Sequence, residues 1–115
     1  MGKFRIVGGN KLSGSIVPQG AKNEAMQIIC ASLLTEEQVT ITNLPNISDI
    51  NNLLDLMKEM GVIVDRVSEN EVKLQAKELN FSYFNTERFY ERATRLRGSV
   101  MILGPMLARF RKGFL

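Results

Sequence analysis

Lys22 and Asn23 are the residues whose type and position most clearly suggest chemistry, because they stand where a glycine turn runs into an apolar helix. Gly20 can adopt backbone angles closed to other residues, so the chain can turn sharply there. Unpaired backbone N–H groups and the helix dipole favour an anion at such an N-terminus. The lysine ammonium adds a full positive charge, and the Asn amide adds a donor and an acceptor. The stretch therefore predicts a phosphate or carboxylate site, with a merely solvated lysine as the alternative.

A second group of candidate anion ligands lies in the last quarter of the chain, where basic side chains outnumber acidic ones. Arginine offers bidentate hydrogen bonds to phosphate. Arg97 is the most interesting, because apolar neighbours leave a purely solvated charge poorly placed there. The alternative is a solvated basic face without a ligand. Nucleic-acid binding is less favoured, because arginines at the two ends of one helix make a small contact surface for nucleic acid. The cluster comprises Arg88, Arg92, Arg95, Arg97, Arg109, Arg111 and Lys112.

Cys30 is the only cysteine, and it lies in the middle of the apolar helix. A reactive thiol needs exposure and a lowered pKa, and its apolar neighbours predict a small buried hydrophobe instead. One cysteine forms no internal disulfide, which fits a reducing cytoplasm. With no histidine in the chain, a metal site of the His/Cys type is not expected.

The composition is that of a small globular domain, with 44% hydrophobic and 23% charged residues in 115. The net charge of +3 suits small anionic ligands, and the absence of Trp leaves few platforms for stacking bases. No apolar run approaches the roughly 20 residues that span a bilayer, and the N-terminus has no apolar core of a signal peptide. We therefore expect no membrane and no nucleic-acid partner.

The expected strands are short and rich in β-branched residues. Alternating segments flank a Gly-Gly-Asn turn near the N-terminus and predict a hairpin, and a second hairpin is expected beyond residue 61. The predicted strands cover residues 3–7, 11–17, 38–42, 62–67 and 72–74.

Helices are expected between these strands, which makes an α/β layer fold. The first covers residues 23–34, and the second has Ser48 as its N-cap, Asp49 in its first turn and Gly61 as its stop. Residues 78–90 have no clear pattern, and their aromatic side chains should anchor a loop on the core. A last helix is predicted from about residue 92 to 110, kinked at Pro105.

Several motifs together resemble the start of the UDP-N-acetylglucosamine enolpyruvyl transferases (1-carboxyvinyltransferases). They occur in the same order and extend over nearly the whole chain, which makes the set more specific than any single motif. The tetrad of residues 20–23, Gly-Ala-Lys-Asn, favours this family over the shikimate-pathway transferases, which usually have Gly-Ser-Lys-Ser. The matching stretches are Phe4–Gly8, Leu12–Gly14, Gln19–Ala25, Ala31–Leu34, Asn43–Pro45, Asp49, Leu53–Gly61, Leu96–Val100 and Leu103–Arg109.

The resemblance implies transfer of the enolpyruvyl group of phosphoenolpyruvate to the 3′-hydroxyl of UDP-N-acetylglucosamine, the first committed step of peptidoglycan synthesis, in the cytoplasm. By position, Lys22 and Asn23 would contact phosphoenolpyruvate, and Arg97 would contact UDP-N-acetylglucosamine. The family needs no metal and no organic cofactor, and no obligate protein partner is expected. The alternatives are a 3-phosphoshikimate 1-carboxyvinyltransferase and a non-enzymatic basic module that binds phosphates or nucleic acid.

The resemblance also implies an incomplete fold. The family has two domains of repeated β-α-β-α-β-β units (an inside-out α/β barrel), and its first two strands pack in the second domain. Residues 1–21 would be that strand pair, ending at the hinge, and residues 22–115 would be part of the first domain. The proton-donor cysteine of the family would lie beyond Leu115, and Cys30 does not match it. We therefore expect a fragment that is inactive alone.

Overall fold

A three-stranded antiparallel sheet organises residues 2–114, the part of the chain that the computed structural model describes. Its strands are β1 (Val39–Ile41), β2 (Ile63–Ser68) and β3 (Glu71–Gln75), in the spatial order β1-β3-β2. Leu74 on the central strand pairs with Val39 on one side and with Val64 on the other. These three strands and the hairpin of β2 and β3 confirm the predicted strands at residues 38–42, 62–67 and 72–74 to within a residue or two at each end.

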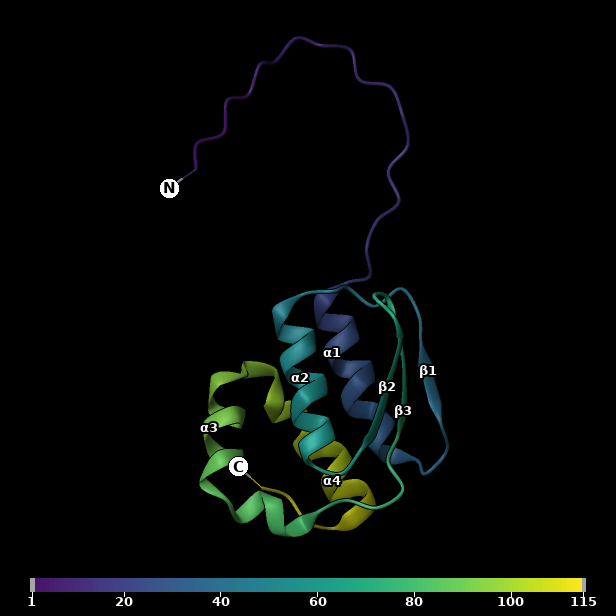
Figure 1. Ribbon diagram of the computed structural model, residues 1–115, viewed down its shortest axis with the longest axis vertical. Coiled ribbons are helices and arrows are strands. Elements are labelled where there is room, and N and C mark those ends of the chain that lie inside the picture. Colours follow the sequence, from purple (N-terminus) through teal and green to yellow (C-terminus); the bar gives the residue numbers. More distant parts are fainter. Residues whose placement is uncertain (1, 115) are drawn as a thin grey trace.

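Two helices cover one face of this sheet (Figure 1). They are α1 (Lys22–Ala31), which continues into the short 3-10 helix η1 (Ser32–Leu34), and α2 (Ser48–Glu59). Both were predicted, although α2 begins one residue early, so Ile47 and not Ser48 is the N-cap. Gly61 ends α2 with a φ of +103°, a conformation that favours glycine.

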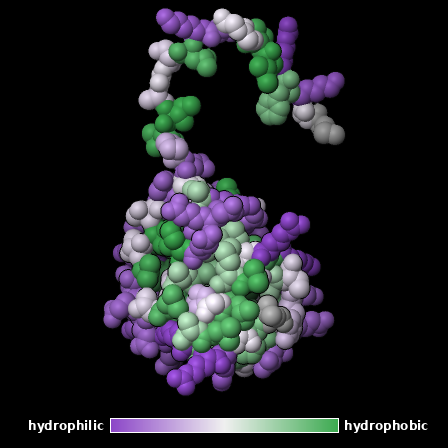
Figure 2. All heavy atoms as spheres, turned by 180° about the vertical axis from the view of Figure 1, so that it is seen from behind, coloured by the Kyte–Doolittle hydropathy of each residue, from purple (hydrophilic) through white to green (hydrophobic). Residues whose placement is uncertain are grey.

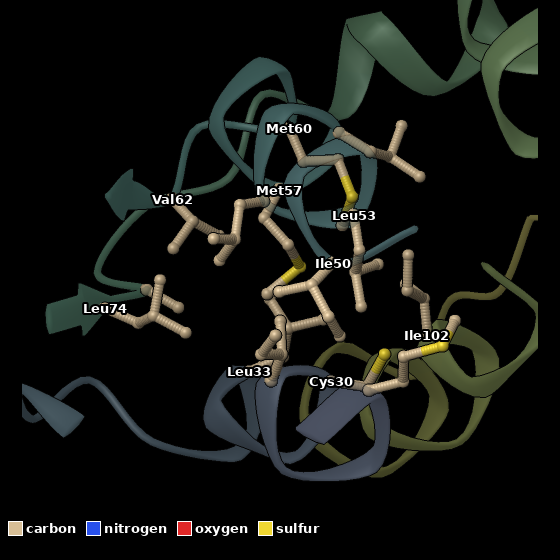
Figure 3. Close-up of a cluster of buried hydrophobic side chains, with 14 of the residues drawn as sticks. Cys30, Leu33, Ile50, Leu53, Met57, Met60, Val62, Leu74 and Ile102 are labelled. Carbon is tan, nitrogen blue, oxygen red and sulfur yellow. The ribbon is translucent and has the colours of Figure 1, made fainter. Parts of the chain in front are cut away.

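The core lies between these helices and the inner face of the sheet, as Figure 3 shows for the side chains of α1, α2 and β3. On β3, Val72 and Leu74 point inward and are fully buried, while the residues between them are partly exposed. This alternation is what a sheet with one covered face requires. The fully buried members also include Ile29, Leu33, Ile50, Leu53, Leu56, Met57 and Met60.

The last third of the chain is a string of short helices. They are η2 (Phe81–Asn85), α3 (Glu87–Arg95), η3 (Arg97–Ile102) and α4 (Leu103–Phe110). The single kinked helix predicted from about residue 92 to 110 is therefore wrong. Leu96 is buried in an extended conformation (φ −109°, ψ 101°) that interrupts the helix. Pro105 is the third residue of α4, where a missing N–H costs no helical hydrogen bond.

Aromatic side chains join these helices to the core, as the sequence predicted. Phe84 is buried, and its ring lies 4.9 Å from that of Phe89 and 4.5 Å from that of Phe114, centroid to centroid. Residues 78–90 are more regular than expected, because Thr86 caps α3 by accepting a hydrogen bond from the backbone N–H of Phe89.

Residues 2–21 contain no strand, so the predicted N-terminal hairpin is absent. The segment leaves the body at the start of α1 and arches away from it (Figure 1). Its apolar side chains alternate with polar ones along the arch (Figure 2), and Phe4 is 99% exposed. The alternation is present, but an isolated two-stranded hairpin is marginal in water without a surface to cover. The predicted packing against a second domain stays a prediction.

Candidate functional site

The three predicted binding residues line one pocket of about 460 Å³. Lys22 and Asn23 come from the start of α1, and Arg97 comes from the junction between α3 and η3. Asp49 from the first turn of α2 completes the charged part of the lining, together with Arg95. The fold therefore brings together residues that lie more than 70 positions apart in the sequence.

The start of α1 is held in place by a close backbone approach at Gly20. A Cβ at this position would lie 2.1 Å from the backbone oxygen of Asn43, too close for any side chain. Gly20 does not have a positive φ, so the reason for glycine is lack of space and not the turn angle that the sequence suggested. Ala21 is the N-cap of α1 and no side chain caps this helix, which leaves its N-terminus open to an anion.

Lys22 is positioned by Asp49. The Lys22 Nζ lies 2.8 Å from Asp49 Oδ2, and the two side chains are 48% and 45% exposed. Half-exposed ion pairs contribute little to stability, so an incoming anion can compete for this ammonium group at small cost. Sequence reasoning placed Asp49 in the first turn of α2 and matched it to the family, but missed its place in this site.

Arg97 reaches the pocket because the chain around it is tightly packed. Leu96 before it and Gly98 after it are both buried. A Cβ on Gly98 would lie 1.8 Å from the terminal methyl of Met26, so a larger residue here would require this side chain to move. The backbone is fixed on both sides of Arg97 while its side chain stays exposed.

The basic cluster predicted from the sequence does not form one surface. Arg88 and Arg92 both pair with Glu59, at 2.6 Å and 3.2 Å. Arg109 lies in the interior, where its side chain is 14% exposed and its Nη1 donates to backbone carbonyls. Only Arg95 and Arg97 of the cluster line the pocket that also holds Lys22. The whole cluster is therefore not one phosphate site. Most of its members are exposed, as the alternative of a solvated basic face predicts, and Arg109 is the clear exception.

A larger hollow of about 690 Å³ lies beside this pocket, along α3. Arg88 and Arg92 in its lining both pair with Glu59, whose single charge offsets one of their two, and Glu59 also accepts a hydrogen bond from the Tyr83 hydroxyl. The hydrogen bond from Arg88 is the main cause that lowers the pKa of Glu59 below its ordinary value of 4.5. Burial, and next the bond to Glu59, raise the pKa of Tyr83 to about 12. This network ties α3 to the end of α2.

We expect Glu59→Gln to lower the free energy of unfolding by about 1 kcal/mol at pH 7, after allowance for solvent screening. A carboxyl whose pKa is lowered by folding contributes stability above its unfolded pKa and loses it as the pH falls. The difference between wild type and variant should therefore shrink between pH 5 and pH 3, as measured by urea unfolding. Glu91→Gln, on the same hollow but without an ion pair in residues 2–114, is the matched control. Equal losses at pH 7 and pH 3 would contradict the role of the Glu59 charge.

Cys30 is structural, as predicted. Its side chain is 2% exposed between α1 and the start of α4, near Ile102 (Figure 3). Burial raises the pKa of its thiol to about 12, so it is a neutral, unreactive group at physiological pH. Within residues 2–114, no three His, Cys, Asp or Glu side chains lie close enough together to hold a metal ion. No helix in the same range has the length and apolar character needed to cross a membrane.

Comparisons with known proteins agree on one group of enzymes. The sequence profile described as EPSP synthase (3-phosphoshikimate 1-carboxyvinyltransferase) matches residues 6–114. A UDP-N-acetylglucosamine 1-carboxyvinyltransferase of Bacteroides thetaiotaomicron is 50% identical over 115 residues, which are 100% of this chain and 26% of that protein. The protein of the same name from Porphyromonas gingivalis is 48% identical over 110 residues, covering 96% of this chain and 25% of its own length.

The solved structures give the same fold. The enolpyruvyl transferase NikO from Streptomyces tendae superposes with a TM-score of 0.63 at 22% identity, over 89% of this chain and 23% of its own. The chain thus spans about a quarter of the length of the proteins it matches.

Proposed function

The chain belongs to the EPSP synthase family of carboxyvinyltransferases, and from that premise we propose that it serves the transfer of an enolpyruvyl group from phosphoenolpyruvate to the 3′-hydroxyl of UDP-N-acetylglucosamine. Relatives about half identical to it carry the name of that activity. In this reaction the sugar oxygen bonds to C2 of the enolpyruvyl group while the sugar O–H bond and the bond from C2 to the phosphate oxygen break, and phosphate and the hydroxyl proton are released. The corresponding cellular role is peptidoglycan synthesis in the cytoplasm.

The observation that carries the proposal is the convergence of Lys22, Asn23 and Arg97 on one pocket. An ammonium group, a guanidinium group and an uncapped helix N-terminus all favour phosphate and carboxylate oxygens. We propose that Lys22 and Asn23 contact phosphoenolpyruvate and that Arg97 contacts UDP-N-acetylglucosamine. Positive charge around the phosphate also stabilises the negative charge that the leaving group gains.

The residues that line this pocket support binding of the substrates better than their conversion. The family resemblance assigns proton donation to a cysteine, and Cys30 is too buried and too weakly acidic for that role. The pocket formed by residues 2–114 is open, so these residues alone do not exclude water from it. We therefore expect the 115-residue chain by itself to bind the substrates without converting them. Residues 1–21 would contribute to a second domain, as the resemblance implies.

Two observations bear on the alternatives. The matching profile is described by the shikimate-pathway activity, so 3-phosphoshikimate is the competing acceptor. A nucleic-acid module is disfavoured, because Arg88, Arg92 and Arg109 are engaged within the protein. Calorimetric competition separates the two acceptors: UDP-N-acetylglucosamine should bind and shikimate 3-phosphate should not displace it.

We expect Lys22→Gln and Arg97→Gln each to weaken binding of the substrate anions by about tenfold, since a charge-assisted hydrogen bond contributes about 1.5 kcal/mol. Lys22→Gln should act mainly on phosphoenolpyruvate, and Arg97→Gln mainly on UDP-N-acetylglucosamine. Isothermal titration of the full chain measures both. Lys73→Gln is the matched control, because Lys73 alternates with inward-pointing residues on β3 and lines no part of this pocket. Equal losses in all three variants, or no binding by the wild type, would contradict the proposal.

A further inference from the structure

Arg95 and Arg97 reach the same pocket because the chain between them is extended. Residues two apart on an α-helix point about 200° away from each other, since each residue turns by about 100°. Leu96, with φ −109° and ψ 101°, is the one extended residue between α3 and η3 and interrupts this regular rotation. It is 7% exposed and belongs to the lining of the pocket itself. The break therefore places Arg95, at the end of α3, and Arg97, at the start of η3, in the lining of one pocket.

These two arginines differ from the other basic residues nearby in having no carboxylate partner within residues 2–114. The ion pairs of this region occupy Arg88 and Arg92 with Glu59, and Lys22 with Asp49. Asp49 is the one acidic residue in the lining of the pocket as the structure describes it. Because it already holds Lys22 at 2.8 Å, the charges of Arg95 and Arg97 remain available to a ligand.

We propose that Arg95 is a second anion-contacting residue of this site, which binds a phosphate group jointly with Arg97. Two guanidinium forks match the several oxygens of a phosphate group better than they match the two oxygens of a carboxylate. The pair therefore makes the pocket select phosphate groups over carboxylates. This inference rests on the proposed function, because it assumes that Lys22, Asn23 and Arg97 form an anion site. It adds to that function a specificity-determining residue that the family resemblance does not assign.

The test is a set of titrations of the full chain with inorganic phosphate, UDP-N-acetylglucosamine and pyruvate, the last being a carboxylate without phosphate. Arg95→Gln should weaken binding of phosphate and UDP-N-acetylglucosamine by about tenfold and leave pyruvate within about twofold. Arg95→Lys keeps the charge but loses the fork, so its affinities should fall between those of wild type and Arg95→Gln. Arg92→Gln is the matched control, one helical turn earlier and paired with Glu59, and it should change all three affinities by less than about twofold. Urea midpoints of every variant verify that the fold is kept.

The outcomes separate this inference from the function it rests on. If Arg97→Gln loses phosphate affinity while Arg95→Gln behaves like wild type, the role of Arg95 is overturned and the proposed site stands. If Arg95→Gln and Arg92→Gln lose affinity equally, or if Arg95→Gln weakens pyruvate as much as phosphate, general charge explains the data and selectivity by Arg95 is overturned. If the wild type binds none of the three probes, both proposals fall.

Discussion

Replacement of Arg109 by methionine should lower the free energy of unfolding by about 2–3 kcal/mol, because it leaves several partly buried carbonyl groups without a donor. The Arg109 Nη1 donates to the backbone oxygens of Leu33 at 2.9 Å, Thr35 at 3.1 Å and Ala76 at 2.6 Å. Nη2 also lies 3.2 Å from a carboxylate oxygen of Glu36. Methionine keeps much of the aliphatic volume and supplies none of these hydrogen bonds, so the measured loss reports the donors.

Urea unfolding followed by circular dichroism gives the free energies for this comparison. Arg111→Met is the control, because Arg111 is exposed two residues later and its loss should cost less than about 0.5 kcal/mol. Arg109→Lys should recover only part of the stability, since an ammonium group cannot reproduce the planar fork. Equal losses for Arg109→Met and Arg111→Met would show that the interior hydrogen bonds contribute nothing.

Phe84→Ala should destabilise the fold by about 3–5 kcal/mol, the usual range for a buried phenylalanine. Phe84 is 1% exposed and lies between Phe89 of α3 and Phe114 near the C-terminus. Its removal leaves a cavity and takes away both ring contacts, which contribute beyond the buried area itself. Thermal and urea unfolding both measure the loss.

The N-terminal segment provides a matched control for Phe84→Ala, because it contains an exposed phenylalanine. Phe4 is 99% exposed, so Phe4→Ala removes an identical side chain without creating a cavity and should change the free energy of unfolding by less than about 0.5 kcal/mol. A similar loss in both variants would mean that residues 2–21 pack on the body in solution, in conflict with the structure.

Most of the sheet and its two covering helices could be predicted from the sequence, because local patterns decide them. The β-branched run of β1, the helical spacing of α2 and the glycine at its end each specify a structure with few competitors. The N-terminal hairpin has an equally clear alternation, but alternation only marks a side that could be buried. No surface in residues 2–114 covers that side, so the strands do not form.

Elements decided by distant contacts were missed. Helix propensity continues through Leu96, yet burial of its side chain and the hydrogen bond from the Ser99 hydroxyl to the Ala93 carbonyl stabilise a break. The residues around Arg109 in the sequence do not distinguish it from a surface arginine. The carbonyl groups that accept its hydrogen bonds lie 33 to 76 residues away along the chain. A positive charge in a sequence does not distinguish a solvated side chain from an interior donor.

The lining of the pocket that we propose as the binding site could be predicted in part. Lys22 and Asn23 were identified from a local helix start, and Arg97 from its apolar neighbours and the family resemblance. Asp49 was not recognised as part of the site, because its contact with Lys22 spans 27 residues. Arg95 was placed with the whole basic cluster, since its direction depends on the break at Leu96.

The strand order β1-β3-β2 implies an order of folding. The central strand is the last of the three in the sequence, so β1 has no strand partner until β3 has been formed. The β2–β3 hairpin closes a tight turn and needs few residues to be ordered, whereas β1 joins it only after α2 has brought the two ends together. Arg109 contacts the chain on both sides of this assembly, at Thr35 and Ala76. These hydrogen bonds form together only when the segments at Thr35 and Ala76 and helix α4 are all in place, so we expect the docking of α4 to come late in folding.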